Sequence, residues 1–139
     1  MLSNLRMTPR VPPLIAQTLR ARLARSHAPY SNVRVAAAVA DEVGRIHYGV
    51  NVENAAYPQG VCAEASAISA AIGEGAKSVR RIYLASSLPG LIWPCGGCRQ
   101  KIWEFAEPEC EVISVGADGH AEVHAIAALL PLGFRLPRP

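Results

Sequence analysis

Cys62-Ala63-Glu64 is followed about thirty residues later by Pro94-Cys95-Gly96-Gly97-Cys98, and the two stretches together supply three thiols and one carboxylate. A structural zinc ion is normally held by four protein ligands, whereas a catalytic zinc ion keeps three and leaves the fourth position to water or substrate. The sequence therefore predicts a catalytic zinc site, with one Zn²⁺ per subunit. The expected ligands are Cys62, Cys95 and Cys98.

Both stretches are expected at the beginnings of helices. Residues 62–75 are rich in alanine and end in two glycines, and residues 95–106 follow a proline that can open a helix. The expected buried stripe of the first helix consists of Ala67, Ile68, Ala71 and Ile72. Free N–H groups and the positive end of the helix dipole stabilise thiolates. We therefore expect the two helix N-termini to face one place and to offset the charge of three sulfurs.

Glu64 lies two residues from a ligand, so it can reach water at the open metal position without binding the metal. The pattern matches the general signature of zinc-dependent nucleobase deaminases. By that signature, Glu64 is expected to take a proton from the water and to deliver protons to a ring nitrogen and a departing amine. Two alternatives remain: a first-turn carboxylate that only interacts with the helix dipole, and a structural zinc site closed by Cys110 or a histidine.

The remaining segments predict alternating helices and strands around the two zinc-binding stretches. Helices are expected at 12–27 and 126–130, strands at 33–40, 45–52, 79–85, 109–116 and 120–124, turns at 41–44 and 118–119, and a loop at 51–60. This order predicts a mixed sheet with helices packed on it, in a single α/β domain over residues 1–139. Cys110 is expected to be a buried strand residue, and the histidines to be structural or surface groups.

Composition excludes several classes of protein. Half of the residues are hydrophobic, but no uncharged apolar run approaches the roughly 20 residues of a membrane span. The first six residues lack the apolar block of a secretory signal, so we expect a soluble cytoplasmic protein whose four cysteines serve metal binding or catalysis. The net charge of +3 and the 6% aromatic content disfavour a nucleic-acid surface, and no membrane partner is expected.

These motifs, in this order and spacing, resemble the cytidine deaminase family, specifically the small cysteine-ligated homotetrameric type. Besides the zinc-binding stretches, the resemblance includes Ala28-Pro29-Tyr30-Ser31, Asn51-Val52-Glu53-Asn54-Ala55-Ala56-Tyr57-Pro58, Arg99-Gln100 and Leu129-Leu130-Pro131. It implies a three-layer fold with a mixed five-stranded sheet and helices on both faces. It also implies a homotetramer with shared active sites, which deaminates the small molecules cytidine and 2′-deoxycytidine to the uridines in pyrimidine salvage.

The resemblance further implies roles for individual residues. Asn51 and Glu53 would hold the ribose hydroxyls, and Tyr57 would shape the site. The N–H of Ala63 would meet the pyrimidine carbonyl, and the carbonyl of Trp93 would face the leaving ammonia. Phe134 would reach the base pocket of a neighbouring subunit. Without the resemblance, Asn51 and Glu53 look like ordinary loop residues. A buried amide and carboxylate left unpaired by free cytosine would favour nucleosides over the base.

Two positions depart from the family pattern. Ala65 stands where many members carry an arginine that donates to zinc thiolates, so we hypothesise that the helix ends, aided by Arg99, offset the charge. Val33 stands where a phenylalanine usually lines the base pocket, which predicts weaker cytidine binding or broader base tolerance.

Three alternative functions stay open at this point. One is deamination of another aminopyrimidine nucleoside or of an antibiotic such as blasticidin S. The others are a polynucleotide-editing deaminase and a non-catalytic zinc module that binds RNA. An editing enzyme needs a basic channel for flanking nucleotides, and the chain has only two lysines, Lys77 and Lys101.

Overall fold

The computed structural model describes residues 11–138. The expectation about a secretory signal concerns residues that lie outside this range. The helices are α1 (Pro13–Leu23), α2 (Ala63–Gly73), α3 (Gly96–Phe105), α4 (Ile126–Leu129) and a short 3₁₀ helix η1 (Tyr57–Gln59); the strands are β1 (Val35–Asp41), β2 (Ile46–Val50), β3 (Val79–Ser86), β4 (Ala106–Val115) and β5 (Ala121–Ala125). No helix in residues 11–138 has the length and apolar character needed to cross a membrane.

The five strands form one mixed sheet in the order β2-β1-β3-β4-β5. Strands β3 and β4 run parallel, and the other neighbouring pairs run antiparallel. The predicted hairpin is confirmed as β1 and β2, and its turn contains Gly44 at a φ of +86°, a conformation that glycine adopts without steric cost.

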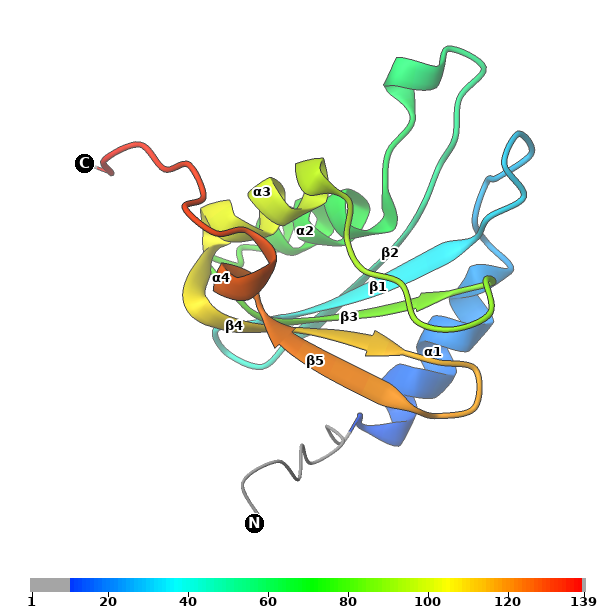
Figure 1. The fold of residues 1–139 in the computed structure, drawn as a ribbon, viewed down its shortest axis with the longest axis horizontal. Helices are drawn as coiled ribbons and strands as arrows, with labels where there is room; N and C mark the ends of the chain where they lie inside the picture. The colour runs from blue at the N-terminus through cyan, green and yellow to red at the C-terminus, as the bar shows by residue number, and fades with distance from the viewer. Residues whose placement is uncertain (1–10, 139) are drawn as a thin grey trace.

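Helices cover both faces of the sheet, which confirms the expected three layers (Figure 1). The alternation along β1 explains the division, because successive side chains of a strand point to opposite faces. Ala36 and Ala38 pack in the core beneath α1, with Ile15 and Leu19 of that helix among its buried members. Ala37 and Val39 face the other core, which α2, α3 and α4 cover.

Glycine at position 49 lets α2 lie close against the sheet. A Cβ atom built on Gly49 of β2 would meet the backbone nitrogen of Ala67 at 2.4 Å and the carbonyl oxygen of Ala63 at 2.7 Å. Real Cβ atoms do not approach backbone so closely, so any larger residue would push α2 outward. The close approach involves the first turns of α2, the helix that begins directly after Cys62.

Three details differ from the sequence-based expectations. Helix α1 ends at Leu23 rather than near residue 27, because the following segment bonds to the sheet region: the Ser26 hydroxyl donates to the carbonyl of Val35. Ile72 is 37% exposed, so the buried stripe of α2 is narrower than predicted. Strand β4 begins at Ala106 and includes Pro108, which is tolerated because residues 107–110 have no paired residue in the described sheet.

Candidate active site

Three sulfur atoms meet at one point of the structure. The Sγ atoms of Cys62, Cys95 and Cys98 all lie within 4.8 Å of one another, and those of Cys62 and Cys95 are 4.0 Å apart. Zn–S bonds of about 2.3 Å in a tetrahedral site place sulfurs about 3.8 Å apart, so the cluster has the spacing and donor type that zinc requires. The predicted ligand set fits one zinc ion.

The cluster forms where two helices begin. Cys62 is the N-cap residue of α2, Cys95 is the N-cap residue of α3, and Cys98 lies in the first turn of α3. The first helical hydrogen bonds are donated by Ser66 N–H to the carbonyl of Cys62 and by Arg99 N–H to that of Cys95. The earlier N–H groups of each helix have no partner within it, so both helix ends direct positive charge at the sulfurs, as predicted.

The three thiols are not equivalent. Burial raises the pKa of Cys98 far above the ordinary range of a thiol, and the nearby carboxyl of Glu64 raises it further. A hydrogen bond from the Cys98 N–H lowers the pKa of Cys95 instead. A cation binds the deprotonated thiolates, so metal binding must release protons and weaken in acid.

Glu64 lies beside the cluster without belonging to it. It is the second residue of α2, only 5% of it is exposed, and its carboxyl is within hydrogen-bond reach of the Cys98 thiol. Burial is the main reason that the pKa of Glu64 is raised above its ordinary value. A carboxyl with a raised pKa can accept a proton and return it, which general acid-base chemistry requires.

No fourth protein ligand joins the three cysteines in residues 11–138. Cys110 is buried in β4, and this burial raises the pKa of its thiol to about 12. His47 is also buried and donates to the carboxylate of Asp41, whereas the ring of His124 packs edge-on against Trp93. The closed structural zinc site therefore receives no support.

A pocket of about 200 Å³ opens beside the sulfurs. Its lining consists of Val35, Asn51, Cys62, Ala63, Glu64, Ile92, Trp93 and Cys95. Three residues that the resemblance assigned to substrate binding, Asn51, Ala63 and Trp93, are thus brought together with the acid and two of the thiols. Sequence reasoning missed Val35 and Ile92, whose apolar side chains carry no chemical signal.

Asn51 also holds the backbone that surrounds this pocket. Its side-chain nitrogen donates to the carbonyl of Val33 at 2.8 Å, and its side-chain oxygen accepts from the N–H of Val35 at 2.8 Å. An amide group can make further bonds through its second hydrogen and second lone pair. Asn51 therefore retains one donor site and one acceptor site for a ligand.

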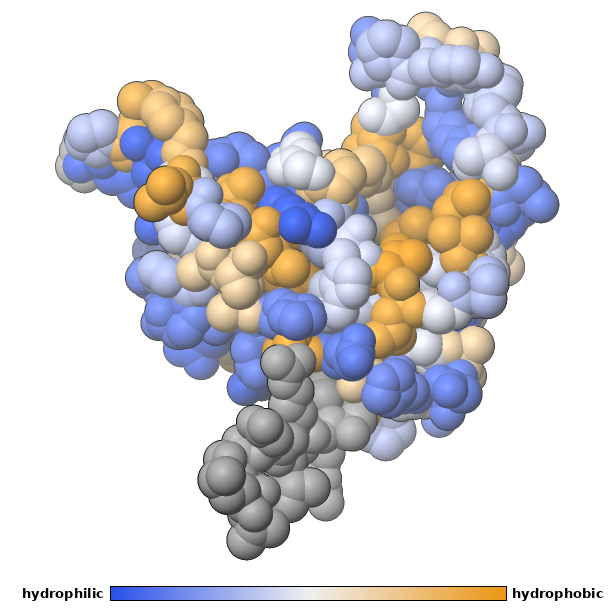
Figure 2. Space-filling model, viewed as in Figure 1, coloured by the Kyte–Doolittle hydropathy of each residue, from blue (hydrophilic) through white to orange (hydrophobic). Residues whose placement is uncertain are grey.

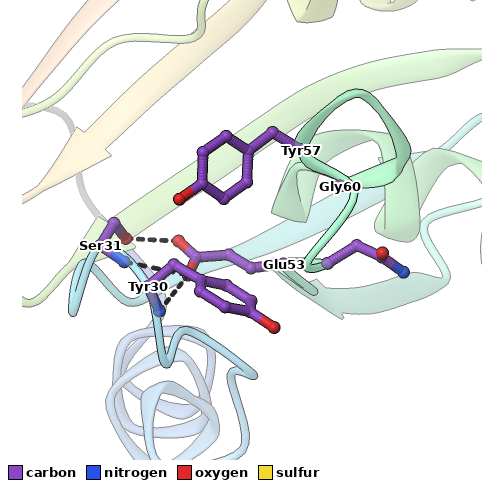
Figure 3. Close-up of a pocket in the computed structure, with 6 residues that line it drawn as sticks. Tyr30, Ser31, Glu53, Tyr57 and Gly60 are labelled. Carbon is purple, nitrogen blue, oxygen red and sulfur yellow. Dashed lines mark hydrogen bonds between the residues drawn. The ribbon is translucent and has the colours of Figure 1, made fainter.

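Glu53 and Tyr57 line a second pocket, of about 390 Å³, together with Tyr30, Ser31, Asn54 and Gly60 (Figure 3). The Glu53 carboxylate accepts from the N–H groups of Tyr30 and Ser31 and from the Ser31 hydroxyl. These bonds, led by that of the Ser31 hydroxyl, lower the pKa of Glu53. The rings of Tyr30 and Tyr57 meet edge-on, with their centroids 5.9 Å apart. Ser31 was noted in the sequence only as part of a motif.

The remaining predicted residues lie outside both pockets. Val33 is half-buried and lines neither of them. Phe134 is 66% exposed in the C-terminal segment, a projecting arm with apolar surface (Figure 2). Gln100 of α3 fixes this residue through its backbone, because the Gln100 side chain donates to the carbonyl of Phe134 and accepts from its N–H.

Arg99 does not interact with the sulfurs in the way the charge hypothesis requires. Its guanidinium donates to the carbonyls of Pro94 and Leu129. Among residues 11–138, no hydrogen bond joins the guanidinium to a cysteine sulfur. Ala65 lines a groove between α2 and α3. Of the groups that the charge hypothesis invokes, the two helix N-termini are therefore the ones that face the sulfurs.

Comparison with known proteins places these features in a family. Residues 15–114 match the family described as the cytidine and deoxycytidylate deaminase zinc-binding region. The cytidine deaminase of Sporosarcina psychrophila is 37% identical to this chain, and the match covers 87% of this chain and 88% of that protein. A probable cytidine deaminase of Dictyostelium discoideum is 42% identical, and the match covers 76% of this chain and 71% of that protein. The crystal structure of a cytidine deaminase from Burkholderia pseudomallei superposes with a TM-score of 0.83 at 33% identity, covering 90% of this chain and all of that one.

Proposed function

This chain belongs to the cytidine and deoxycytidylate deaminase family, and we propose that it hydrolyses cytidine and 2′-deoxycytidine to the uridines, with release of ammonia. One observation carries the proposal: of three thiols with zinc spacing, two line a pocket together with a buried carboxyl whose pKa is raised. Three protein ligands leave a tetrahedral ion one open position, which is the arrangement of catalytic rather than structural zinc.

The protein's own residues would move the protons of the reaction. When bound, Zn²⁺ supplies a Lewis acid that lowers the pKa of water. Glu64 takes one proton from the attacking water and passes it to the pyrimidine ring nitrogen. It then takes the remaining proton of the hydroxyl group that has added to the ring carbon and gives it to the amino group, which leaves as ammonia when its bond to that carbon breaks. Its burial beside the cluster supports this double role, because a carboxyl whose pKa is raised toward the working pH can both take up a proton and release it again.

The other lining residues would orient the nucleoside. The N–H of Ala63, at the start of α2, has no helical partner and suits the pyrimidine carbonyl, while the carbonyl of Trp93 suits the leaving ammonia. Asn51 and Glu53 would bind the ribose hydroxyls, and Tyr57 would cover the sugar. Unpaired polar groups disfavour a ligand that lacks the sugar, so we propose nucleosides rather than free cytosine as substrates.

The lining of both pockets favours a neutral nucleoside over a nucleotide or polynucleotide. The described residues that line them include two carboxylates and neither lysine nor arginine. A phosphate needs cationic or N–H donors, and a polynucleotide needs a basic channel. Aminonucleoside antibiotics such as blasticidin S remain the second candidate substrate class, because Ala65 departs from the usual cytidine deaminase pattern and antibiotic deaminases also resemble this chain around the zinc-binding stretches.

We further propose a homotetramer in which Phe134 completes a neighbour's pocket, acting in pyrimidine salvage in the cytoplasm. Three apolar side chains of the C-terminal segment, those of Leu132, Phe134 and Leu136, are at least 66% exposed and would be covered by assembly. The described cysteines are free thiols, which suits a reducing compartment.

The decisive test is to incubate the zinc-loaded protein with cytidine and follow the fall in absorbance as uridine forms. The Glu64→Ala variant is the control, since general acid-base catalysis contributes roughly 10²–10⁴-fold in rate. Deoxycytidine, cytosine and blasticidin S, tested in the same assay, separate the substrate classes. Full activity of Glu64→Ala with unchanged zinc content would refute the mechanism. Activity on blasticidin S alone would refute cytidine and 2′-deoxycytidine as the substrates.

A further inference from the structure

Arg99 joins two segments that lie far apart along the chain. Its Nε donates to the carbonyl of Pro94 at 2.7 Å, and a terminal guanidinium nitrogen donates to the carbonyl of Leu129 at 2.9 Å. Pro94 directly precedes the ligand Cys95, and Leu129 is the last residue of α4. We propose that Arg99 is a positioning residue for the metal centre, an inference that rests on the proposed function.

The segment that Arg99 holds has no regular secondary structure of its own. Residues 87–95 connect β3 to α3 without helix or strand, so their conformation depends on contacts made by other residues. The N–H of Ile92 donates to the Ser114 hydroxyl at 3.1 Å, and the Trp93 ring packs against His124 with a centroid separation of 4.6 Å. Both contacts hold residues that line the pocket.

Arg99 contacts the backbone on both sides of the ligand Cys95. Its side chain binds the carbonyl of Pro94, and its backbone N–H donates to the carbonyl of Cys95 at 2.9 Å. One residue therefore holds the two consecutive peptide groups from which the Cys95 side chain projects. Since the sulfurs must converge within tenths of an ångström, a rotation of these peptides would misplace a ligand.

The two hydrogen bonds that the Arg99 guanidinium makes to the carbonyls of Pro94 and Leu129 form a bridge between the β3–α3 connection and α4. Leu129 ends a helix of four residues, and its carbonyl has no partner within that helix, so the guanidinium caps it. Arginine can bind both carbonyls at once because its guanidinium is planar and carries five donors, whereas lysine offers a single ammonium on a flexible stem. A lysine at position 99 would keep the charge and lose the bridge.

Two substitutions separate the bridge from the charge. Arg99→Gln removes both, and Arg99→Lys removes the bridge alone. The matched control is Arg20→Gln. Arg20 lies in α1, on the opposite face of the sheet from α3, and its guanidinium donates in the same way to two carbonyls, those of Ser86 and Val115 at the ends of β3 and β4. Zinc affinity is measured by competition with a chromogenic chelator, the absorption spectrum of the cobalt-loaded protein reports ligand geometry, and thermal unfolding reports stability.

We expect zinc affinity to fall about tenfold or more in both Arg99 variants, the range seen when groups that orient metal ligands are lost, with a changed cobalt spectrum. Arg20→Gln should lose thermal stability and keep its zinc affinity. Wild-type affinity in Arg99→Lys would overturn the proposal by showing that charge suffices, and so would equal affinities in Arg99→Gln and Arg20→Gln. A wild-type protein that binds zinc but leaves cytidine intact would refute the proposed function alone, since the affinities are measured without substrate.

Discussion

Gly49 of β2 and Ala67 of α2 lie so close together that a Cβ atom at position 49 would stand 2.4 Å from the Ala67 nitrogen. The same atom would be 2.8 Å from the Cβ of Ser66. Helix α2 begins directly after Cys62 and carries Glu64 in its first turn. The absence of a side chain at position 49 therefore sets how closely the N-terminal part of α2 approaches the sheet.

Gly49→Ala is expected to destabilise the protein and to disturb the metal centre. Forcing an additional methyl group into a packed core typically costs about 1–3 kcal/mol, and here the obstacle is helix backbone, which cannot rotate aside. Urea unfolding measures the loss of stability, and metal analysis of the purified variant measures the loss of zinc.

Gly73→Ala is the control for that substitution. A Cβ atom at position 73, the last residue of α2, would meet nothing within 4 Å, and alanine is the better helix former by up to about 1 kcal/mol. This variant should be as stable as the wild type or more so. Equal stability of Gly49→Ala and Gly73→Ala would show that α2 can move away from the sheet without cost.

The predictable part of the molecule is the part that local rules govern. Pro94 and the Cys-x-x-Cys spacing place Cys95 at a helix start, and the Asp41–Gly44 turn predicts a hairpin, because capping and turn chemistry act over a few residues. The glycine of β2 is different, since its role depends on a helix that begins fourteen residues later. An isolated glycine within a strand pattern was the available signal for a close approach of backbone.

Side-chain partners could not be predicted in the same way. Arg99 was expected to act on the sulfurs, but it binds two carbonyls, one of which lies thirty positions along the chain. The exposure of Ile72 also escaped prediction, because α2 is apolar around most of its circumference and its sequence does not mark which side meets the sheet.

Asp41 is expected to make the stability of the protein depend on pH in acid. Asp41 is fully buried at the end of β1, and burial alone would raise its pKa. Hydrogen bonds from His47 and from the backbone of Arg45 and Val43, together with the charge of Arg45, instead lower the pKa to about 2. The unfolded chain binds this proton near the ordinary value of 3.8. The contribution of Asp41 is therefore present above pH 3.8 and is lost as the pH falls toward 2.

The comparison of wild type with Asp41→Asn isolates this effect. The free energy of unfolding should fall more steeply between pH 5 and about pH 2.5 in the wild type than in the variant, because only the wild type must bind the additional proton. Both proteins are measured without zinc, so that metal release in acid does not contribute. Parallel pH profiles of the two proteins would contradict the assigned role of the carboxylate.

Glu53→Gln is expected to weaken nucleoside binding more than catalysis. Three donors surround the carboxylate, so the amide of glutamine would oppose one of them with a donor of its own. A hydrogen bond to a charged group contributes about 1.5–3 kcal/mol, which predicts a rise of KM for cytidine of roughly 10- to 100-fold. Steady-state kinetics measure it, with Ser31→Ala as a milder change of the same network; an unchanged KM in Glu53→Gln would remove Glu53 from the sugar site.

Cytidine 5′-monophosphate and its deoxy form are expected to be poor substrates, although the family name includes deoxycytidylate. The 5′-phosphate is carried by the same sugar that Glu53 is proposed to bind, and Glu53 stays ionised because its pKa is lowered. Two like charges about 4 Å apart repel by roughly 1–4 kcal/mol, which predicts at least about a fivefold loss of kcat/KM relative to cytidine.

The salt dependence of kcat/KM tests whether charge repulsion is the reason that nucleotides are poor substrates. Screening shortens the Debye length from about 10 Å at 0.1 M to about 3 Å at 1 M salt, so added sodium chloride should narrow the difference between nucleotide and nucleoside. The Glu53→Gln variant should narrow it at low salt as well, since it removes one of the two charges. A difference that persists unchanged under both conditions would mean that shape rather than charge excludes the phosphate. Equal turnover of nucleotide and nucleoside by the wild type would instead show that a cationic group outside these two pockets receives the phosphate.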